Sequence, residues 1–106
     1  MSSQHTPGPW KSLPEEADKP YIRIRGTALG RRYKIANVMD PTYNGATDQD
    51  FEETRANARL IAAAPEMLEV LQDMLYCSEY WSEYFVPLGL VERLNAVIKT
   101  ATGEAT

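Results

Sequence analysis

The spacing of apolar residues changes near residue 48, and this change constrains the fold more than any other feature. Before it, residues 21–25 and 33–39 alternate apolar and polar side chains, which predicts two half-buried strands. After it, apolar residues recur every three or four positions, which predicts helices. The sequence therefore predicts an α+β fold in which a small antiparallel β-sheet of two or three strands precedes three packed helices.

Turn and cap residues set the expected boundaries. Residues 26–32 contain two glycines and join the strands as a hairpin loop, and residues 9–13 are a weaker candidate for an edge strand. The acids that begin at Asp48, with Pro65 and Pro87, predict helices near 50–63, 65–82 and 88–101. The expected organisation is a single domain over 1–106, with a sheet region near 9–39, a helical region near 48–101 and flexible tails at 1–6 and 102–106.

The expected core follows from these patterns. One face of each strand and one stripe of each helix are apolar, and the domain is stabilised by burying them against one another. The predicted members are Ile22, Ile24, Ile35, Val38, Leu60, Ile61, Leu68, Leu71, Leu75, Leu94 and Val97.

Composition excludes several classes of function. The single cysteine, Cys77, allows no internal disulfide and suits a reducing compartment. One cysteine and one histidine cannot form a zinc or iron–sulfur site, so we expect no metal and no other cofactor. No window approaches about 20 apolar residues, so no membrane partner is expected. Cys77 lies within a predicted helix and His5 near the terminus, and helix initiation explains the acids at 48–53, so we expect no enzyme.

Charge points to a local anion site. The net charge of −4 disfavours general DNA binding, yet residues 19–34 carry six cations and no acid. Arg23 and Arg25 project from one face of a strand, where Arg31 and Arg32, with Lys34, would help them line an anion groove. The alternative is a solvated sheet face whose arginines pair with acids across the strands.

Two segments carry a resemblance to a known family. They are His5-Thr6-Pro7-Gly8-Pro9-Trp10 and Ala56-Asn57-Ala58-Arg59-Leu60-Ile61-Ala62-Ala63-Ala64-Pro65-Glu66-Met67-Leu68-Glu69-Val70-Leu71. Together they resemble the widespread family of small phage and prophage proteins with an N-terminal TPGPW motif and an ANARLIAAAPE(M/L)LE helix motif. The resemblance implies an accessory or anti-defence role in the cytoplasm of the infected bacterial host. It favours binding over catalysis and assigns no active residue.

Three residues within these motifs are candidate ligand contacts. Trp10 is expected to cover the edge of the core, and the alternative is an aromatic platform for a base or for a side chain of a partner. Asn57 and Arg59 are expected to satisfy backbone carbonyls or an acid. The alternative is that Arg59 holds an anionic ligand while Asn57 contacts an amide or a base edge.

An aromatic cluster in residues 76–85 predicts self-association. A domain of this size cannot bury so many rings alone, so we expect a homo-oligomer with a subunit boundary at Tyr80, Trp81, Tyr84 and Phe85.

The functional hypothesis is a non-enzymatic phage protein that neutralises host defence by sequestering a small anionic nucleotide, such as a cyclic nucleotide. Rings and guanidinium groups are what such a ligand requires. The alternatives are a protein-binding inhibitor of a host defence complex, similar to CRISPR inhibitors, and a structural or regulatory prophage protein.

Overall fold

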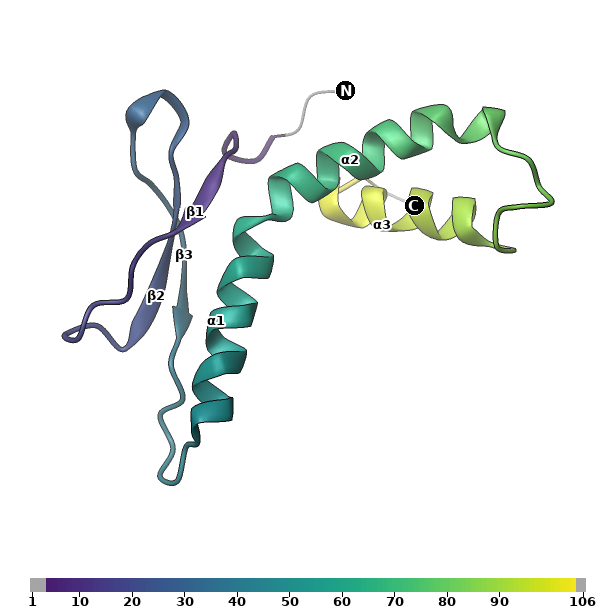
Figure 1. Cartoon of the computed structure of the whole chain (residues 1–106). Helices are drawn as coiled ribbons and strands as arrows, with labels where there is room; N and C mark the ends of the chain where they lie inside the picture. The colour runs from purple at the N-terminus through teal and green to yellow at the C-terminus, as the bar shows by residue number, and fades with distance from the viewer. Residues whose placement is uncertain (1–3, 105–106) are drawn as a thin grey trace. The chain divides into compact units, whose positions relative to one another are not determined.

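The computed structural model describes residues 4–104 and has the predicted α+β class. One antiparallel sheet contains β1 (Trp10–Ser12), β2 (Tyr21–Gly26) and β3 (Tyr33–Met39) in that spatial order (Figure 1). The helices are α1 (Asp48–Ala62), α2 (Ala64–Cys77) and α3 (Leu90–Thr102). The chain divides into two compact units: the sheet unit, residues 6–65, and the hairpin unit, residues 66–104 with Gln4 and His5. The single domain over 1–106 stays a prediction.

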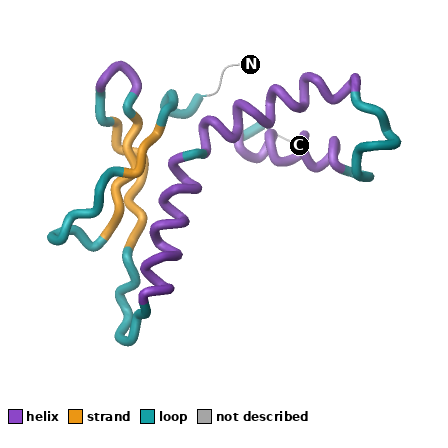
Figure 2. The backbone as a smooth tube through the Cα atoms, in the orientation of Figure 1, coloured by secondary structure: helices purple, strands orange, loops and turns teal. Residues whose placement is uncertain are grey.

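The core of the sheet unit lies between the sheet and α1. Ile22 and Ile24 of β2 are 4% and 0% exposed, and they pack with Ala58 of α1, which is 1% exposed. Alternation along β2 directs both isoleucines to one face. Because Ala58 has only a methyl side chain, α1 can lie close to the strands, as Figure 2 shows. Trp10, Ile35 and Val38 pack around this centre.

The start of α1 is fixed by a capping box at Thr47. The Thr47 side chain accepts a hydrogen bond from the backbone N–H of Asp50, and the Asp50 carboxylate accepts one from the Thr47 backbone N–H at 2.8 Å. These bonds lower the pKa of Asp50, with a further contribution from the Tyr43 hydroxyl. The acid-rich helix start predicted from sequence is confirmed.

The hairpin unit has a separate and smaller core. Leu68 of α2 packs with Leu94 and Ile98 of α3, and all three are buried. Leu71, Leu75 and Trp81 lie around them half-buried. Two helices therefore share one narrow apolar seam.

Several sequence predictions need correction. Leu60 and Val97, predicted as core, are 60% and 49% exposed. Each lies one position from a residue that packs on the core of its unit, Leu60 beside Ile61 and Val97 beside Ile98, and therefore points about 100° away from it. The second helix ends at Cys77 and not near 82, since a short 3₁₀ turn, Ser78–Tyr80, follows it.

The C-terminal end of α3 also differs from the predicted tail. The helix continues to Thr102 and ends at Gly103, whose φ of 77° suits a residue without a side chain. The backbone N–H of Glu104 donates to the Lys99 carbonyl at 3.0 Å. Residues 1–3 and 105–106 of the predicted tails lie outside the described residues.

Candidate functional site

The face of the sheet that is opposite α1 carries the predicted arginines. In β2, Ile22 and Ile24 are buried toward α1, while Tyr21, Arg23 and Arg25 alternate with them on the other face. The predicted placement of Arg23 and Arg25 on one face is therefore confirmed. We call this surface the open face.

Strand register aligns three cations across the open face. Lys11 of β1 is the partner of Arg25, and Arg25 is the partner of Lys34 of β3. Residues paired in this way place their side chains on the same face about 5 Å apart, so Lys11, Arg25 and Lys34 form a row across all three strands. Among the described residues, none of the three forms an ion pair. We call this the cation row.

A register shift in β3 makes the row possible. The pairing runs from Ile24 and Ala36 directly to Arg25 and Lys34, so Ile35 is an extra residue in β3. Ile35 packs against the core, and Lys34 is exposed. Sequence reasoning did not include Lys11, because only the pairing of the short β1 strand places it beside Arg25.

Arg25 is held in position by neutral groups. Its Nη1 donates to the carbonyls of Ile24 and Ala36 at 2.9 and 3.1 Å, and its Nη2 donates to Oδ1 of Asn37 at 3.2 Å. These bonds orient the guanidinium and use no carboxylate. Its charge is therefore uncompensated, and part of its fork of five N–H donors stays available.

Arg23 is paired with an acid, as the alternative interpretation expected, but that acid, Glu16, lies in the connection between β1 and β2 and not on a neighbouring strand. The Nη2 of Arg23 lies 2.6 Å from Oε1 of Glu16, and the other carboxylate oxygen, Oε2, lies 2.8 Å from Nζ of Lys19. The hydrogen bond from Lys19 and the charge of Arg23 lower the pKa of Glu16. Glu16 thus neutralises the Arg23 end of the open face and leaves the cation row as its positive part.

Arg31 and Arg32 lie beside the cation row in the connection between β2 and β3. A 3₁₀ turn, Ala28–Gly30, precedes them, and Leu29 at its centre has a φ of 57° and is 92% exposed. Both arginines are exposed, and neither side chain bonds to another described residue. The connection therefore adds two exposed cations next to the end of the sheet at which Arg25 pairs with Lys34.

Arg59 lies on the opposite side of the sheet. It lines a cleft of about 270 Å³ with Arg55, the β1–β2 connection and the inward-facing Ile22. Arg55 donates to Glu15 at 2.9 Å and to Glu52, and these bonds raise its pKa. The side chain of Arg59 is exposed and bonds to no described residue, so the structural role expected for it has no support.

Asn57 and Arg59 do not face one site. Positions two apart on a helix differ by about 200° in direction. Arg59 lines the cleft, whereas Asn57 is exposed and lies outside its lining. The structure does not bring these two residues together.

Trp10 packs against the core of the sheet unit. Its indole N–H donates to the Thr6 carbonyl at 3.0 Å, and its side chain lies with Ile22, Ile24 and Ala58. Because Trp10 is on the inner face of the sheet, it is separated from the cation row. These contacts favour an anchoring role, and stacking on a ligand stays a prediction.

The four residues of the expected subunit boundary differ in exposure. Trp81 packs on the hairpin core, whereas Tyr80, Tyr84 and Phe85 are 79%, 87% and 88% exposed. The burial of Trp81 is explained by its contacts within the hairpin unit. The subunit boundary at the three exposed rings stays a prediction.

Comparison with known proteins identifies the family. The family model of Salmonella phage P22 protein Y8K6 matches residues 1–105. The chain belongs to this family. The expected membership of a small phage protein family is thereby confirmed. No curated protein and no solved structure matches the chain.

Other features of this Y8K6-family member concern membranes and metals. Within residues 4–104, no helix has the length and apolar character needed to cross a bilayer. The same residues contain no group of three or more histidine, cysteine or acidic side chains placed to hold a metal ion. The TPGPW and ANARLIAAAPE(M/L)LE motifs stay predicted markers of the family.

Proposed function

We propose that this phage-family protein is a non-enzymatic binding protein that sequesters a small anionic signal of host defence, of the cyclic-nucleotide type. The observation that carries the proposal is the cation row, in which Lys11, Arg25 and Lys34 lie side by side without a carboxylate partner among the described residues. The proposed place of action is the cytoplasm of the infected host.

The chemistry of the open face suits a nucleotide with more than one phosphate. Adjacent strands are about 4.8 Å apart, so the cation row spans about 10 Å and can contact two phosphates. Arg25 offers a planar donor fork, and the two lysines add point charges. Tyr21 lies on the same face, four residues along β2, and supplies a ring for a base. Arg31 and Arg32 increase the local positive potential.

A thermal-shift assay with a panel of cyclic mononucleotides and dinucleotides tests this proposal on the full chain. A ligand at about 100 times its Kd stabilises the folded state by about 2.7 kcal/mol, which raises Tm by about 10 °C or more. We expect at least one messenger to produce such a shift and the others to produce none. Small molecules released from protein purified out of infected cells, identified by mass spectrometry, extend the panel.

Matched variants locate the binding site. We expect Lys11→Ala combined with Lys34→Ala to abolish the shift while the Tm without ligand stays nearly unchanged, because both side chains are exposed. Arg59→Ala removes one exposed cation on the opposite side of the sheet and should retain the shift. Loss of the shift in the Arg59 variant alone would place the ligand in the cleft. No shift with any messenger or released molecule would contradict the proposal.

A second candidate function is inhibition of a host defence protein by direct binding. The exposed segment that holds Tyr84, Phe85 and Leu88 favours it, since these side chains are 87%, 88% and 104% exposed. Aromatic side chains are enriched at protein interfaces. Binding to a purified defence complex that is lost on Phe85→Ser and kept in the lysine double variant would support this candidate over ligand sequestration.

A further inference from the structure

The cleft at Arg59 lies within the sheet unit, on the side of the sheet that carries α1. Its volume is about 270 Å³. The side chains that line it are of two kinds, apolar (Leu13, Pro14 and Ile22) and polar or charged (Ser12, Glu15, Arg55 and Arg59). The proposed function uses the opposite face of the sheet and leaves this cleft without a role.

Arg59 gives the cleft a positive charge that no described residue neutralises. Its side chain forms neither a hydrogen bond nor an ion pair within residues 4–104. The positions three and four residues away hold three alanines and Arg55, so no acid is within helical reach. Like charges four residues apart on a helix repel each other. An anion bound beside Arg59 therefore relieves this repulsion.

Arg55 and the connection between β1 and β2 form a fixed wall of the cleft. The Nε of Arg55 donates to the Glu15 carboxylate at 2.9 Å, and the backbone N–H of Leu13 donates to the Arg23 carbonyl at 2.9 Å. The connection is thus held at two points before a ligand arrives, which lowers the entropic cost of binding. Because Arg55 and Glu15 compensate each other, the uncompensated charge of the lining is that of Arg59.

The Ser12 hydroxyl is a second polar group without a bond. Ser12 is the register partner of Ile24, and paired residues share a face, so its side chain lies on the side of the sheet where Ile24 is buried. Its hydroxyl bonds to no residue in the described part of the chain. A hydroxyl can donate one hydrogen bond and accept others. Arg59 and Ser12 therefore offer a charged and a neutral donor in one cleft.

Charge and size indicate the class of ligand. A guanidinium binds a carboxylate through two parallel N–H···O bonds, and one uncompensated cation matches the single charge of a carboxylate. A phosphate with nearly two negative charges finds no second free cation in this lining and also faces Glu15. The cleft is smaller than the about 300–1,000 Å³ of drug-sized pockets. Since three of its lining side chains are apolar, the group attached to the carboxylate is short and aliphatic.

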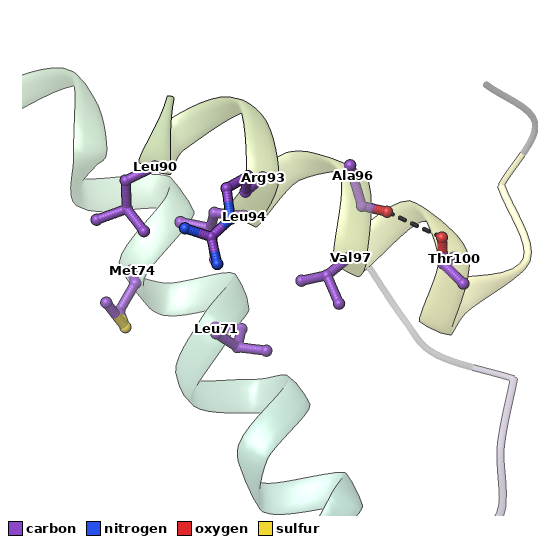
Figure 3. A pocket seen from close by; sticks show the side chains of 8 residues that line it. All are labelled: Leu71, Met74, Leu90, Arg93, Leu94, Ala96, Val97 and Thr100. Atoms are coloured by element: carbon purple, nitrogen blue, oxygen red, sulfur yellow. Dashed lines mark hydrogen bonds between the residues drawn. The ribbon is translucent and has the colours of Figure 1, made fainter. Parts of the chain in front are cut away.

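A larger hollow between α2 and α3, of about 580 Å³, lacks this combination (Figure 3). Its lining is apolar apart from Arg93 and Thr100. The Thr100 hydroxyl already donates to the Ala96 carbonyl at 3.1 Å, as the dashed line in Figure 3 shows. Of the two hollows, the cleft at Arg59 is the one in which an uncompensated cation and an unbonded hydroxyl lie beside an apolar floor.

We propose that the cleft at Arg59 binds a carboxylate carried on a short aliphatic group, as at the end of a protein chain whose last residue is leucine or valine. The carboxylate accepts from the Arg59 guanidinium and from the Ser12 hydroxyl. The aliphatic group lies against Leu13, Pro14 and Ile22. This site is separate from the cation row and does not depend on the proposed function.

N-acetylleucine is the probe, because it carries a carboxylate and an aliphatic group but no ammonium. At millimolar concentrations we expect it to shift the backbone amide NMR signals of residues 12–15 and 55–59 in the full chain. N-acetylleucinamide has no carboxylate and should shift none of them. Within the proposal, tighter binding of a tripeptide that ends in leucine identifies a chain end as the source of the carboxylate, and equal binding identifies a free acid. Equal shifts with the amide, or displacement of the probe by inorganic phosphate, would overturn the proposal.

Variants locate the probe in the cleft. Arg59→Gln should weaken binding by roughly tenfold, since charge-assisted hydrogen bonds are the strong ones, and Ser12→Ala should weaken it by a smaller factor. Arg93→Gln is the matched control, because it removes an exposed cation in the hairpin unit and should leave binding unchanged. Lys11→Ala with Lys34→Ala should also leave it unchanged, which separates this site from the cation row. Unchanged affinity in Arg59→Gln, or loss of binding in the lysine double variant, would contradict the assignment.

Discussion

The sheet unit and the hairpin unit differ in how many large apolar side chains they leave exposed and in whether their charged residues form ion pairs. In the sheet unit, α1 covers Ile22 and Ile24, and the large apolar side chains that stay exposed are fewer than in the hairpin unit: Leu29, Met39, Tyr43 and Leu60. In the hairpin unit, large apolar side chains stay exposed along both helices and in the segment between them. Every ion pair among the described residues lies in the sheet unit.

This difference shows which part of the chain is complete by itself. A three-stranded sheet with a helix on one face can bury a core and still present a polar open face for binding. A pair of helices cannot do both, because each apolar stripe beyond the seam is left in water. The proposed ligand binding therefore belongs to the sheet unit, and the self-association predicted from the aromatic segment stays a prediction for the hairpin unit.

The largest expected loss of stability comes from truncating a buried side chain in either of the two cores. Ile24→Ala should lower the free energy of unfolding by about 4 kcal/mol, since the side chain is completely buried. Ile98→Ala should cost about 2 kcal/mol, because its smaller core can relax around the lost methyl groups. Urea unfolding followed by circular dichroism measures both. A larger loss for Ile98→Ala would contradict the ranking of the two units.

A smaller effect is expected at the start of α1. Thr47→Ala removes the side-chain oxygen that accepts from the Asp50 backbone N–H, which should cost about 1 kcal/mol. Thr47→Ser keeps the oxygen and is the control. Equal stabilities of the two variants would show that the capping box does not hold α1 against the sheet.

Arg55 and Arg59 line the same cleft, and only Arg55 forms ion pairs with described residues. Replacing each in turn therefore compares a paired arginine with an unpaired one. Arg55→Ala breaks the bonds to Glu15 and Glu52, both partly exposed, and should lower the free energy of unfolding more than Arg59→Ala does. Arg59→Ala should change stability by less than about 0.5 kcal/mol, because its side chain bonds to no described residue. Chemical denaturation resolves this difference. If Arg59→Ala proved the costlier of the two, Arg59 would have a structural role after all.

Acid should weaken the sheet unit through Asp50. Hydrogen bonds from the Thr47 backbone and from Tyr43 lower the pKa of Asp50 below its ordinary value of 3.8. The carboxylate therefore contributes stability above about pH 4, and this contribution is lost as pH falls through the lowered pKa. We expect the difference in Tm between the native chain and Asp50→Ala to shrink as the pH is lowered from neutral through this range. A difference independent of pH would exclude this origin.

Local patterns in the sequence were sufficient to predict the elements. Alternation in residues 21–25 and the helical spacing after residue 48 gave the strands and helices within a few residues, apart from the end of α2. Exposure was harder to predict. Leu60 and Val97 satisfy a general helical pattern, but each lies beside the buried stripe, and only the packing partner determines which stripe is covered.

The candidate site was predictable in part. The density of arginine in residues 19–34 indicated the open face, and the period of two placed Arg23 and Arg25 on it correctly. Lys11 and the pairing of Arg23 with Glu16 depend on strand register and on the path of a connection, which no local pattern encodes. Trp10 and Arg59 joined the same predicted site because sequence order does not reveal opposite faces of a sheet.

Hydrogen exchange at two protein concentrations tests most directly the claim that only the hairpin unit needs a partner. The exchange of backbone amides is followed by mass spectrometry below and above the concentration at which sedimentation detects association. We predict slower exchange in α2 and α3 at the higher concentration and unchanged exchange in β2 and β3. Exchange that is independent of concentration in both units, or that slows in both together, would contradict the account.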